Sequence, residues 1–438
     1  MEYKMLFDLP PILGLAPIFL YMFLGFRGVH PLIATVSSCF LGAVLSQQTL
    51  MSFAVSIKNG AGSFLALIGL LVVLGTSLAE VLKESGGGQI LVRGILKHFG
   101  HSQRGIILGT MIALVIFSVS LGSMVASTAL VATVAIAMAA TAKISPSAMA
   151  IAFHCGSVAG LFIGPFSAPT VQMLEISKLT YWEYLLGVSL PMAIIVFCVG
   201  VFMSFRAQRL YGSTMLYPEE DAEKLDDEFT PTNPQKRSAW AFCLTITSLI
   251  AYGIYIKGGM TFAFAIMILV AIITGLSGGM GTKGTMDTML RGGERMLWFY
   301  LMFVFFDPFI VYVGQTGAFS ALVTLFKPVI DAFGAIGFII GGAAIGIFGI
   351  SGAAVAQVTL MDSMFRQIFA SFTTIPLTLY LTMLFMGAQI TSFAYPGADM
   401  MAEMGLARSS NIRSITVNGF VVTGIMLIYI TIRSFISI

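Results

Sequence analysis

The chain has 438 residues, of which 57% are hydrophobic and only 10% are charged, with a formal net charge of +3. Together with a mean hydropathy of +0.94, this composition excludes a soluble globular domain and is typical of proteins that cross a membrane several times. The small, scattered charge excludes a nucleic-acid-binding surface. The four cysteines lack metal-ligand spacing, so we expect no metal centre and no cofactor.

The first half of the chain contains apolar runs long enough to cross a bilayer, which takes about 20 helical residues. They lie at residues 10–26, 31–46, 62–82, 146–165 and 182–205. The second half has matching runs at 238–256, 260–276, 296–313, 376–395 and 415–432. The predicted fold is therefore an all-α polytopic membrane protein with about 10 transmembrane helices.

A longer apolar segment separates the third and fourth runs of each half, at 105–142 and 336–372. Near the middle of these segments lie Gly122 and Ser123 in the first and Ser351 and Gly352 in the second. Glycine and hydroxyl residues halfway along such a segment predict a re-entrant hairpin whose tip lies inside the membrane. Two full spans are the alternative. The amphipathic runs at 85–100 and 317–334 predict helices along the interfaces.

The two halves also share a repeated residue pattern. Gly122, Val125, Ala126 and Pro146 recur 230 positions later as Gly352, Val355, Ala356 and Pro376, and Gly156 and Pro165 recur 231 positions later as Gly387 and Pro396. We interpret residues 1–206 as an N-terminal membrane repeat and residues 238–438 as a C-terminal one. The positive-inside rule then places most basic loops in the cytoplasm and both termini outside, in a bacterial-type inner membrane. Each half has an odd number of crossings, so the repeats are predicted to be inverted.

Residues 207–237 form the only sizeable polar segment and include the acidic run YPEEDAEKLDDEFTPTNPQKR. Acidic and proline-rich composition predicts a flexible cytoplasmic linker between the repeats. A regulatory docking segment is the alternative.

Glycine and proline interrupt the two repeated runs, and a helix interrupted in a membrane leaves backbone N–H and C=O groups that need a partner. The interruptions are predicted at Gly156, Gly160, Gly164 and Pro165, and at Gly387, Pro396 and Gly397. Freed helix N-termini can hold an anion, and freed carbonyls can hold Na⁺. Close helix packing is the alternative role of small residues. The predicted substrate-binding residues are Gly122, Ser123, Ser127, Thr128, Gly156, Ser157, Ser351, Gly352, Gly387, Gln389, Thr391 and Ser392.

Ionisable residues inside apolar runs are costly and therefore candidates for function. Asp307 lies beside Pro308 in the ninth run, and His154 adjoins Gly156, so we predict that these two residues couple a cation to transport. Asp362 and Arg366 are spaced for an ion pair within one helix. Glu80 and Asp399 are interpreted as interfacial.

The stretch SIKNGAGSFLALIGLLVVLGTSLAEVLKESGGGQILVRGILKHFG at residues 56–100 resembles proteins of the gluconate permease family. The similarity of layout continues to the APT at 168–170 and through residues 345–438. The resemblance implies the ion transporter superfamily, whose members move organic anions with H⁺ or Na⁺ or exchange Na⁺ for H⁺. Three regions that carry ionisable or histidine- and proline-rich patterns in gluconate permeases read SVSLGS, SVAGLFIGPFS and IGIFGIS here. This difference argues against a sugar acid as substrate.

We therefore expect a secondary active transporter that moves a small organic anion, a carboxylate, with H⁺ or Na⁺ by alternating access. A Na⁺/H⁺ antiporter without an organic substrate is the alternative. No HExxH, GxSxG or P-loop motif indicates an enzyme. The amphipathic run at 85–100 favours a homodimer.

Overall fold

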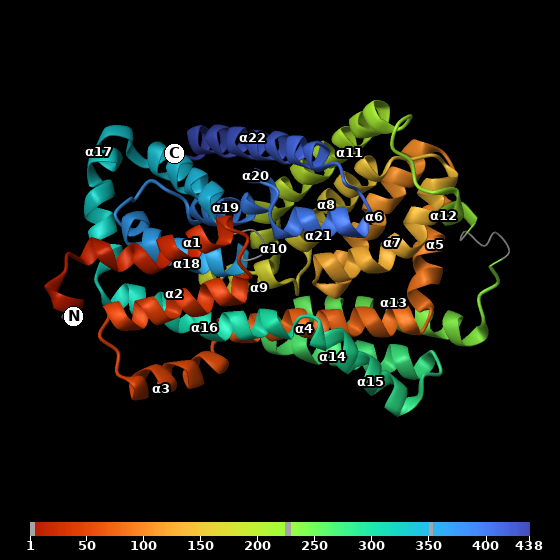
Figure 1. The fold of residues 1–438 in the computed structure, drawn as a ribbon, viewed down its shortest axis with the longest axis horizontal. Helices are drawn as coiled ribbons and strands as arrows, with labels where there is room; N and C mark the ends of the chain where they lie inside the picture. Colours follow the sequence, from red (N-terminus) through yellow and green to blue (C-terminus); the bar gives the residue numbers. More distant parts are fainter. Residues whose placement is uncertain (1–4, 224–228, 350–353) are drawn as a thin grey trace. The chain divides into compact units, whose positions relative to one another are not determined.

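Figure 1 shows the computed structural model, which describes residues 5–223, 229–349 and 354–438. Regular structure in these three ranges is helical throughout, without a strand. The all-α fold class is therefore confirmed.

The first half of the chain begins with two short 3-10 helices, η1 (Leu6–Asp8) and η2 (Pro11–Leu15). They are followed by α1 (Ala16–Phe26), α2 (Pro31–Leu45), α3 (Leu50–Ala61), α4 (Phe64–Glu84), α5 (Gly87–His98), α6 (Gln103–Leu121), α7 (Met124–Thr141), α8 (Pro146–Ile163), α9 (Ala168–Ser177), α10 (Tyr181–Tyr184) and α11 (Leu190–Tyr211). A π-helical turn, η3 (Leu185–Ser189), joins α10 to α11 just before Pro191, whose nitrogen cannot donate a regular helical hydrogen bond.

The second half continues the same helical architecture. Its helices are α12 (Glu219–Glu223), α13 (Asn233–Tyr255), α14 (Gly259–Ser277), α15 (Gly281–Glu294), α16 (Leu297–Gln315), α17 (Ala318–Ile345), η4 (Gly346–Phe348), α18 (Ala354–Ala370), α19 (Leu377–Gln389), α20 (Thr391–Ala394), α21 (Ala398–Leu406) and α22 (Ile412–Ser437).

Serine residues begin the three helices that follow one another from residue 103 to residue 163. The side chain of Ser102 accepts from the backbone N–H of Gly105 at the start of α6, and Ser145 accepts from Ala148 at the start of α8. Ser123 accepts in the same way at the start of α7. A side-chain oxygen at this position satisfies a backbone donor that has no partner within the helix. These caps fix where each apolar helix starts.

Ten segments of the described chain are long and apolar enough to cross a membrane, which confirms the predicted number of about 10. Their identity differs from the prediction at two places. α1 and α2 have 11 and 15 residues, fewer than a full span needs. α6 and α7 have 19 and 18 residues, and each is a candidate span.

The helices fall into two compact units, which we describe separately. Unit 1 comprises residues 1–70, 297–391 and 426–438, and unit 2 comprises residues 71–296 and 392–425. In unit 1, α16 packs against α2 and α3, and α19 packs against α17 and α18. In unit 2, α8 packs against α6 and α11 and also contacts α7 and α21. Each unit thus combines helices from both halves of the sequence, while the division into two repeats stays a prediction.

The first long apolar segment forms a helical hairpin. α6 ends at Gly122, whose φ of 62° is a left-handed conformation that glycine adopts without strain, and α7 starts two residues later. The hydroxyls of Ser118 and Ser127 lie 2.6 Å apart and join the two arms. Because each arm is long enough to cross the membrane by itself, a re-entrant hairpin is not confirmed, and two full spans fit the helix lengths.

The second long segment contains a sharp break. α17 is interrupted at Gly334, where φ is 61° and ψ is −158°. The part before Gly334 corresponds to the amphipathic run predicted at 317–334. α18 follows with 17 residues. Ser351 and Gly352 lie outside the described residues, so the predicted tip of this hairpin has no structural description.

Part of the predicted flexible linker is folded, contrary to expectation. Arg408 Nη1 lies 2.7 Å from Asp221 Oδ2, and Asp221 is almost completely buried. The hydroxyl of Tyr217 donates to the backbone carbonyl of Ala407 over 2.9 Å. α12, which contains Asp221, packs against α7. This group of contacts, between residues 215–221 and the loop 407–411 after α21, is called the linker clasp below.

Candidate functional site

The first broken helix lies at the junction of α8 and α9. The helix ends at Ile163 and restarts at Ala168, so the predicted interruption at Gly164 and Pro165 is present. The helix α8 is continuous through Gly156 and Gly160, where we also predicted a break. A Cβ at Gly156 would lie 3.0 Å from Met111 Cα, so α6 and α8 can approach closely only because this residue has no side chain. Helix packing explains both of these glycines.

The second broken helix lies between α19 and α21. Gly387 is inside α19, so the break predicted there is absent. A Cβ at Gly387 would lie 2.4 Å from Met361 Cε, which again indicates close packing. The other predicted interruption, at Pro396 and Gly397, is present. Residues 395–397 are not helical, and α21 begins at Ala398.

Glu403 of α21 is the centre of the candidate site. Its side chain is fully buried. The Thr128 hydroxyl donates to Glu403 Oε1 over 3.1 Å, and the Ser157 hydroxyl approaches the same oxygen at 3.3 Å. The structure therefore brings together two predicted site residues, one at the start of α7 and one inside α8. It joins them to an acidic residue that the sequence analysis missed.

No basic side chain that the structure describes neutralises Glu403. In the described ranges, no lysine, arginine or histidine nitrogen lies within 4.0 Å of its carboxylate, and Oε2 is buried without a hydrogen-bond partner. α21 is not one of the candidate spans. Burial raises the pKa of the Glu403 carboxyl to about 8, although the hydrogen bonds from Thr128 and Ser157 lower it in part. A carboxyl with this pKa can gain or lose a proton near neutral pH.

Further buried aromatic and polar side chains lie in α8 and beside the second break. The His154 ring, in α8, stacks on Phe393 with the ring centres 4.7 Å apart and an angle of 13° between the planes. Both ring nitrogens of His154 are buried and have no hydrogen-bond partner in the described structure. Beside the break, Ser392 donates to Asp399 over 2.5 Å. Buried donors or acceptors without partners are uncommon, which is consistent with a binding site in this region.

Three other predicted residues of unit 2 shape the α6–α7 hairpin and have no hydrogen bond to Glu403 in the described structure. Gly122 forms the turn, Ser123 caps α7, and Ser127 donates to the carbonyl of Met124 over 2.8 Å. They fix the position of the start of α7, and Thr128 lies in the next turn of the same helix. Gly122 to Ser127 therefore act on the site through helix placement.

The remaining predicted residues belong to unit 1. Gln389 is buried at the end of α19 with its Nε2 atom unpaired, and the Thr391 hydroxyl donates to the carbonyl of Ala388 over 2.8 Å. Asp307 is half-buried inside α16, beside Pro308. These residues stay candidates, but the structure does not relate them to Glu403.

Two further acidic residues are ion-paired. Asp362 and Arg366 form the expected pair within one helix at 2.8 Å, and the Tyr380 hydroxyl also donates to Asp362. Glu80 was interpreted as interfacial, but it is buried and binds both terminal nitrogens of Arg295, at 2.8 and 3.2 Å. Both pairs have a structural explanation. The described chain also contains no cluster of three or more metal-binding side chains.

One sequence signal could have identified Glu403. Pro165 and Pro396 are related by an offset of 231 residues, and the same offset relates Glu403 to Gln172 (403 − 231 = 172). Gln172 lies in α9 and is buried, like Glu403 in α21. An acidic residue in the short helix after a break, with an amide 231 positions earlier in the other short helix, is the signal that could have identified this residue.

Comparison with known proteins identifies the family. Residues 12–248, more than half of the chain, match the GntP family permeases. The chain belongs to the GntP permease family. This result confirms the resemblance seen in the sequence and indicates a membrane transporter and not an enzyme. A search of curated proteins gave no match for this GntP family permease.

Two solved transporter structures share the fold of this GntP family permease. The YdaH transporter of Alcanivorax borkumensis is 12% identical, with 95% of this chain and 97% of that chain covered and a TM-score of 0.56. MtrF of Neisseria gonorrhoeae, described within a class of antimetabolite efflux pumps, is also 12% identical, with 95% and 96% covered and a TM-score of 0.55. At this identity the likeness concerns the fold alone.

Proposed function

We propose that this GntP family permease is a secondary active transporter that moves a small organic anion, a carboxylate, together with protons by alternating access. The observation that carries the proposal is the buried Glu403 carboxyl, which has Thr128 and Ser157 as hydrogen-bond partners and no basic residue beside it among those that the structure describes. In this proposal Glu403 carries the coupled proton.

Electrostatics supports a proton as the coupling ion. An ionised carboxylate that is buried without a counter-ion is unstable by several kcal/mol, and protonation removes this cost. The titratable groups that interact electrostatically with Glu403 are Cys155 and Asp399, so no fixed positive charge among the described residues holds the carboxylate ionised. The Ser157 hydroxyl also lies 2.7 Å from the carbonyl of Phe153, which gives it another acceptor when Glu403 is protonated.

The broken helices support an organic anion as the substrate. α9 and α21 each start directly after a break, and neither has a side-chain cap at its first residue. Backbone N–H groups at such helix starts favour negatively charged groups. Transporters that bind their substrate at discontinuous helices use the same physical principle. A carboxylate fits hydrogen-bond donors of this kind without a fixed positive charge.

The order of helices supports an alternating-access mechanism with two repeats. In the first half α4, α5, the α6–α7 pair, the broken helix α8–α9 and α11 follow one another. In the second half α16, the two parts of α17 with α18, the broken helix α19–α21 and α22 follow in the same order. In the proposal the repeats are inverted, and one bundle moves relative to the other. Asp307, half-buried in a candidate span, is proposed as a second coupling residue.

The test is transport by the purified protein in proteoliposomes. Uptake of labelled mono- and dicarboxylates is measured with an imposed proton gradient, an imposed Na⁺ gradient, or neither. We expect accumulation driven by the proton gradient. Glu403→Gln should abolish accumulation but preserve exchange of labelled for unlabelled substrate, because the variant binds substrate without carrying a proton. Glu175→Gln, an exposed glutamate of α9, is the control and should behave like the wild type.

Other results would overturn parts of the proposal. Proton-driven accumulation by Glu403→Gln would exclude Glu403 as the proton carrier. Na⁺-driven proton flux without uptake of any carboxylate would indicate a Na⁺/H⁺ antiporter. Fast carboxylate flux that is independent of both the proton and the Na⁺ gradient would indicate a channel. Because MtrF is described as an efflux pump, the assay is run in both directions.

A further inference from the structure

A basic cavity lies where the start of α13 meets the end of α14. It contains none of the residues of the Glu403 site. The cavity has a volume of about 810 Å³ and is lined by Asn233, Lys236, Arg237, Trp240, Leu276 and Ser277. The first four residues come from the start of α13, and the last two come from the end of α14. α13 and α14 pack against each other, so the first turn of α13 lies at the same end of this helix pair as Ser277.

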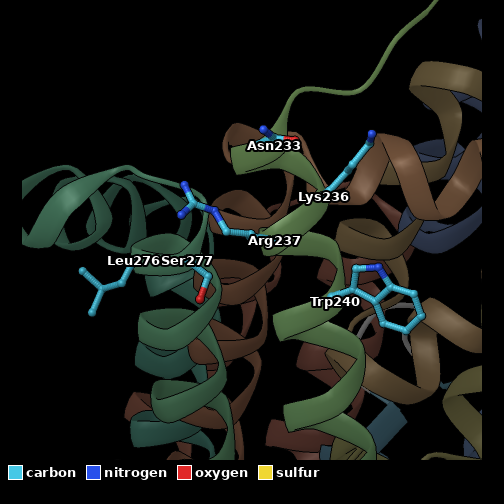
Figure 2. A pocket seen from close by; sticks show the side chains of 6 residues that line it. All are labelled: Asn233, Lys236, Arg237, Trp240, Leu276 and Ser277. Carbon is cyan, nitrogen blue, oxygen red and sulfur yellow. The ribbon is translucent and has the colours of Figure 1, made fainter.

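Figure 2 shows how these side chains are arranged around the start of α13. Arg237 extends from α13 toward Ser277 of α14, whereas Lys236 and Trp240 lie on the other side of α13. Asn233 is at the beginning of the helix. Two positive groups therefore flank one helix start, with an aromatic ring one turn further along the helix from Lys236.

No described carboxylate neutralises the positive charge of the cavity. None of the lining residues is acidic, and across the described ranges no carboxylate lies within 4.0 Å of Lys236 or Arg237. The start of a 23-residue helix adds a partial positive charge at the same place. Lysine, arginine and helix N-termini together favour a phosphate group.

The position of the cavity along α13 matches the boundary between lipid headgroups and hydrocarbon. α13 is a candidate span that begins at Asn233, and Trp240 lies seven residues further on, or about 10 Å at 1.5 Å per residue. Tryptophan is enriched at this depth in membrane proteins. Trp240 is 69% exposed, and Leu244, one turn further along α13, and Leu276 of α14 are also exposed. The cavity thus has a basic polar end and an apolar end.

We propose that this cavity binds the headgroup of an anionic phospholipid. The phosphate lies between Lys236 and Arg237 at the start of α13, and the acyl chains extend along Trp240 and Leu276. A free phosphate ion would use only the polar end of the cavity. The lipid also covers the exposed apolar residues below it, and for this reason we assign a lipid headgroup to the site. The inference does not depend on the substrate or on the coupling ion.

The experiment uses the fluorescence of Trp240. The chain contains three tryptophans, so Trp182→Phe with Trp298→Phe leaves Trp240 as the only one. This variant is reconstituted into vesicles that contain phosphatidylglycerol or phosphatidylcholine brominated near the carbonyl end of one chain, at equal mole fraction. Bromine quenches a nearby indole. We expect at least twofold stronger quenching by the brominated phosphatidylglycerol.

Two charge variants distinguish a specific site from general attraction to a negative surface. Lys236→Gln with Arg237→Gln should abolish the preference for phosphatidylglycerol. Arg209→Gln with Lys283→Gln removes the same charge from two exposed positions outside the cavity and should preserve the preference. Each variant is first checked for a single folded species by size-exclusion chromatography.

The following results would overturn the proposal. Equal quenching by both lipids would exclude an anionic headgroup in the cavity, as would a preference that survives the Lys236→Gln and Arg237→Gln changes. Loss of the preference in 20 mM inorganic phosphate, at about 0.15 M ionic strength in all samples, would assign the cavity to a free phosphate ion.

Discussion

The hydroxyl of Thr128 donates to the carboxylate of Glu403 over 3.1 Å, although the two residues are 275 positions apart in the sequence. Thr128 lies in the second turn of α7, just after the hairpin turn at Gly122, and Glu403 lies in the short helix α21. A shift of the α6–α7 hairpin relative to α21 would change this hydrogen bond. The affinity of Glu403 for a proton is therefore linked to the position of the hairpin.

Thr128→Val should move the pH dependence of transport. The hydroxyl of Thr128 stabilises the ionised form of Glu403, so its removal raises the pKa of the carboxyl above its value of about 8. A hydrogen bond to a charged group contributes about 1.5–3 kcal/mol, and one pKa unit corresponds to about 1.4 kcal/mol. We expect the alkaline decline of proton-driven uptake to shift to higher pH by about one unit. The measurement is the initial rate of uptake between pH 6 and 10.

Two serine variants serve as comparisons in the same assay. Ser157→Ala should give a smaller shift in the same direction, because Ser157 also contacts the carbonyl of Phe153. Ser127→Ala should give no shift, because Ser127 bonds to Met124 and Ser118 and not to Glu403. A shift to lower pH in Thr128→Val would contradict the role assigned to its hydroxyl.

Glu403 should make the folded protein less stable as the pH rises. Its pKa is raised from 4.5 to about 8 in the folded state, so between these values the folded protein binds a proton that the unfolded chain has released. Stability then falls with pH by up to about 1.4 kcal/mol per unit and levels off above the folded-state pKa. Glu403→Gln should remove this slope. Thermal unfolding in detergent from pH 5 to pH 9 compares the two proteins, and parallel curves would mean that Glu403 is not buried in solution.

Two glycine substitutions should lower the stability of the protein for different reasons, one through helix packing and one through turn geometry. A Cβ at Gly156 would approach Met111 Cα and Leu114 Cβ to 3.0 and 3.1 Å, so Gly156→Ala should destabilise the protein by about 1–3 kcal/mol through overpacking. Gly122→Ala should cost about 1–2 kcal/mol, because alanine is strained at positive φ. Gly94→Ala is the control, because no atom lies near the added methyl group and its φ is ordinary. Unfolding temperatures equal to that of Gly94→Ala would contradict both explanations.

The linker clasp should hold α21 in place through the ion pair of Asp221 and Arg408. Because Asp221 is buried, Arg408→Asp should place two acidic groups together and destabilise the protein by about 3–5 kcal/mol. Asp221→Arg alone should also destabilise it. The double variant with exchanged charges should recover at least half of the lost stability and transport. Failure of this exchange to rescue either property would show that the pair does not connect the linker to α21.

The sequence contained enough information to predict the class of fold and the family. Long apolar runs and low charge indicate membrane helices because burying unpaired backbone or charge in hydrocarbon is costly, and this signal is local. The break at Pro165 was predicted for the same reason, because proline cannot continue the hydrogen bonding of a helix. The breaks predicted at Gly156, Gly160 and Gly387 are absent, and close helix packing, the alternative given for these glycines, accounts for them. Glycine occurs both at helix breaks and where helices pack closely. The sequence does not distinguish the two roles, because the difference depends on which helix lies next to the glycine.

Composition, the length of the apolar runs and the positions of glycine and proline thus predicted, from the sequence alone, a helical membrane protein with broken helices, and the resemblance to gluconate permeases indicated a transporter. Only the tertiary structure showed that Thr128 and Ser157 converge on Glu403 and that residues 215–221 dock beside α21. These contacts join segments that are far apart in the chain. Helix propensity and hydropathy act over a few turns, whereas the environment of a carboxyl is set by whichever distant helices pack around it.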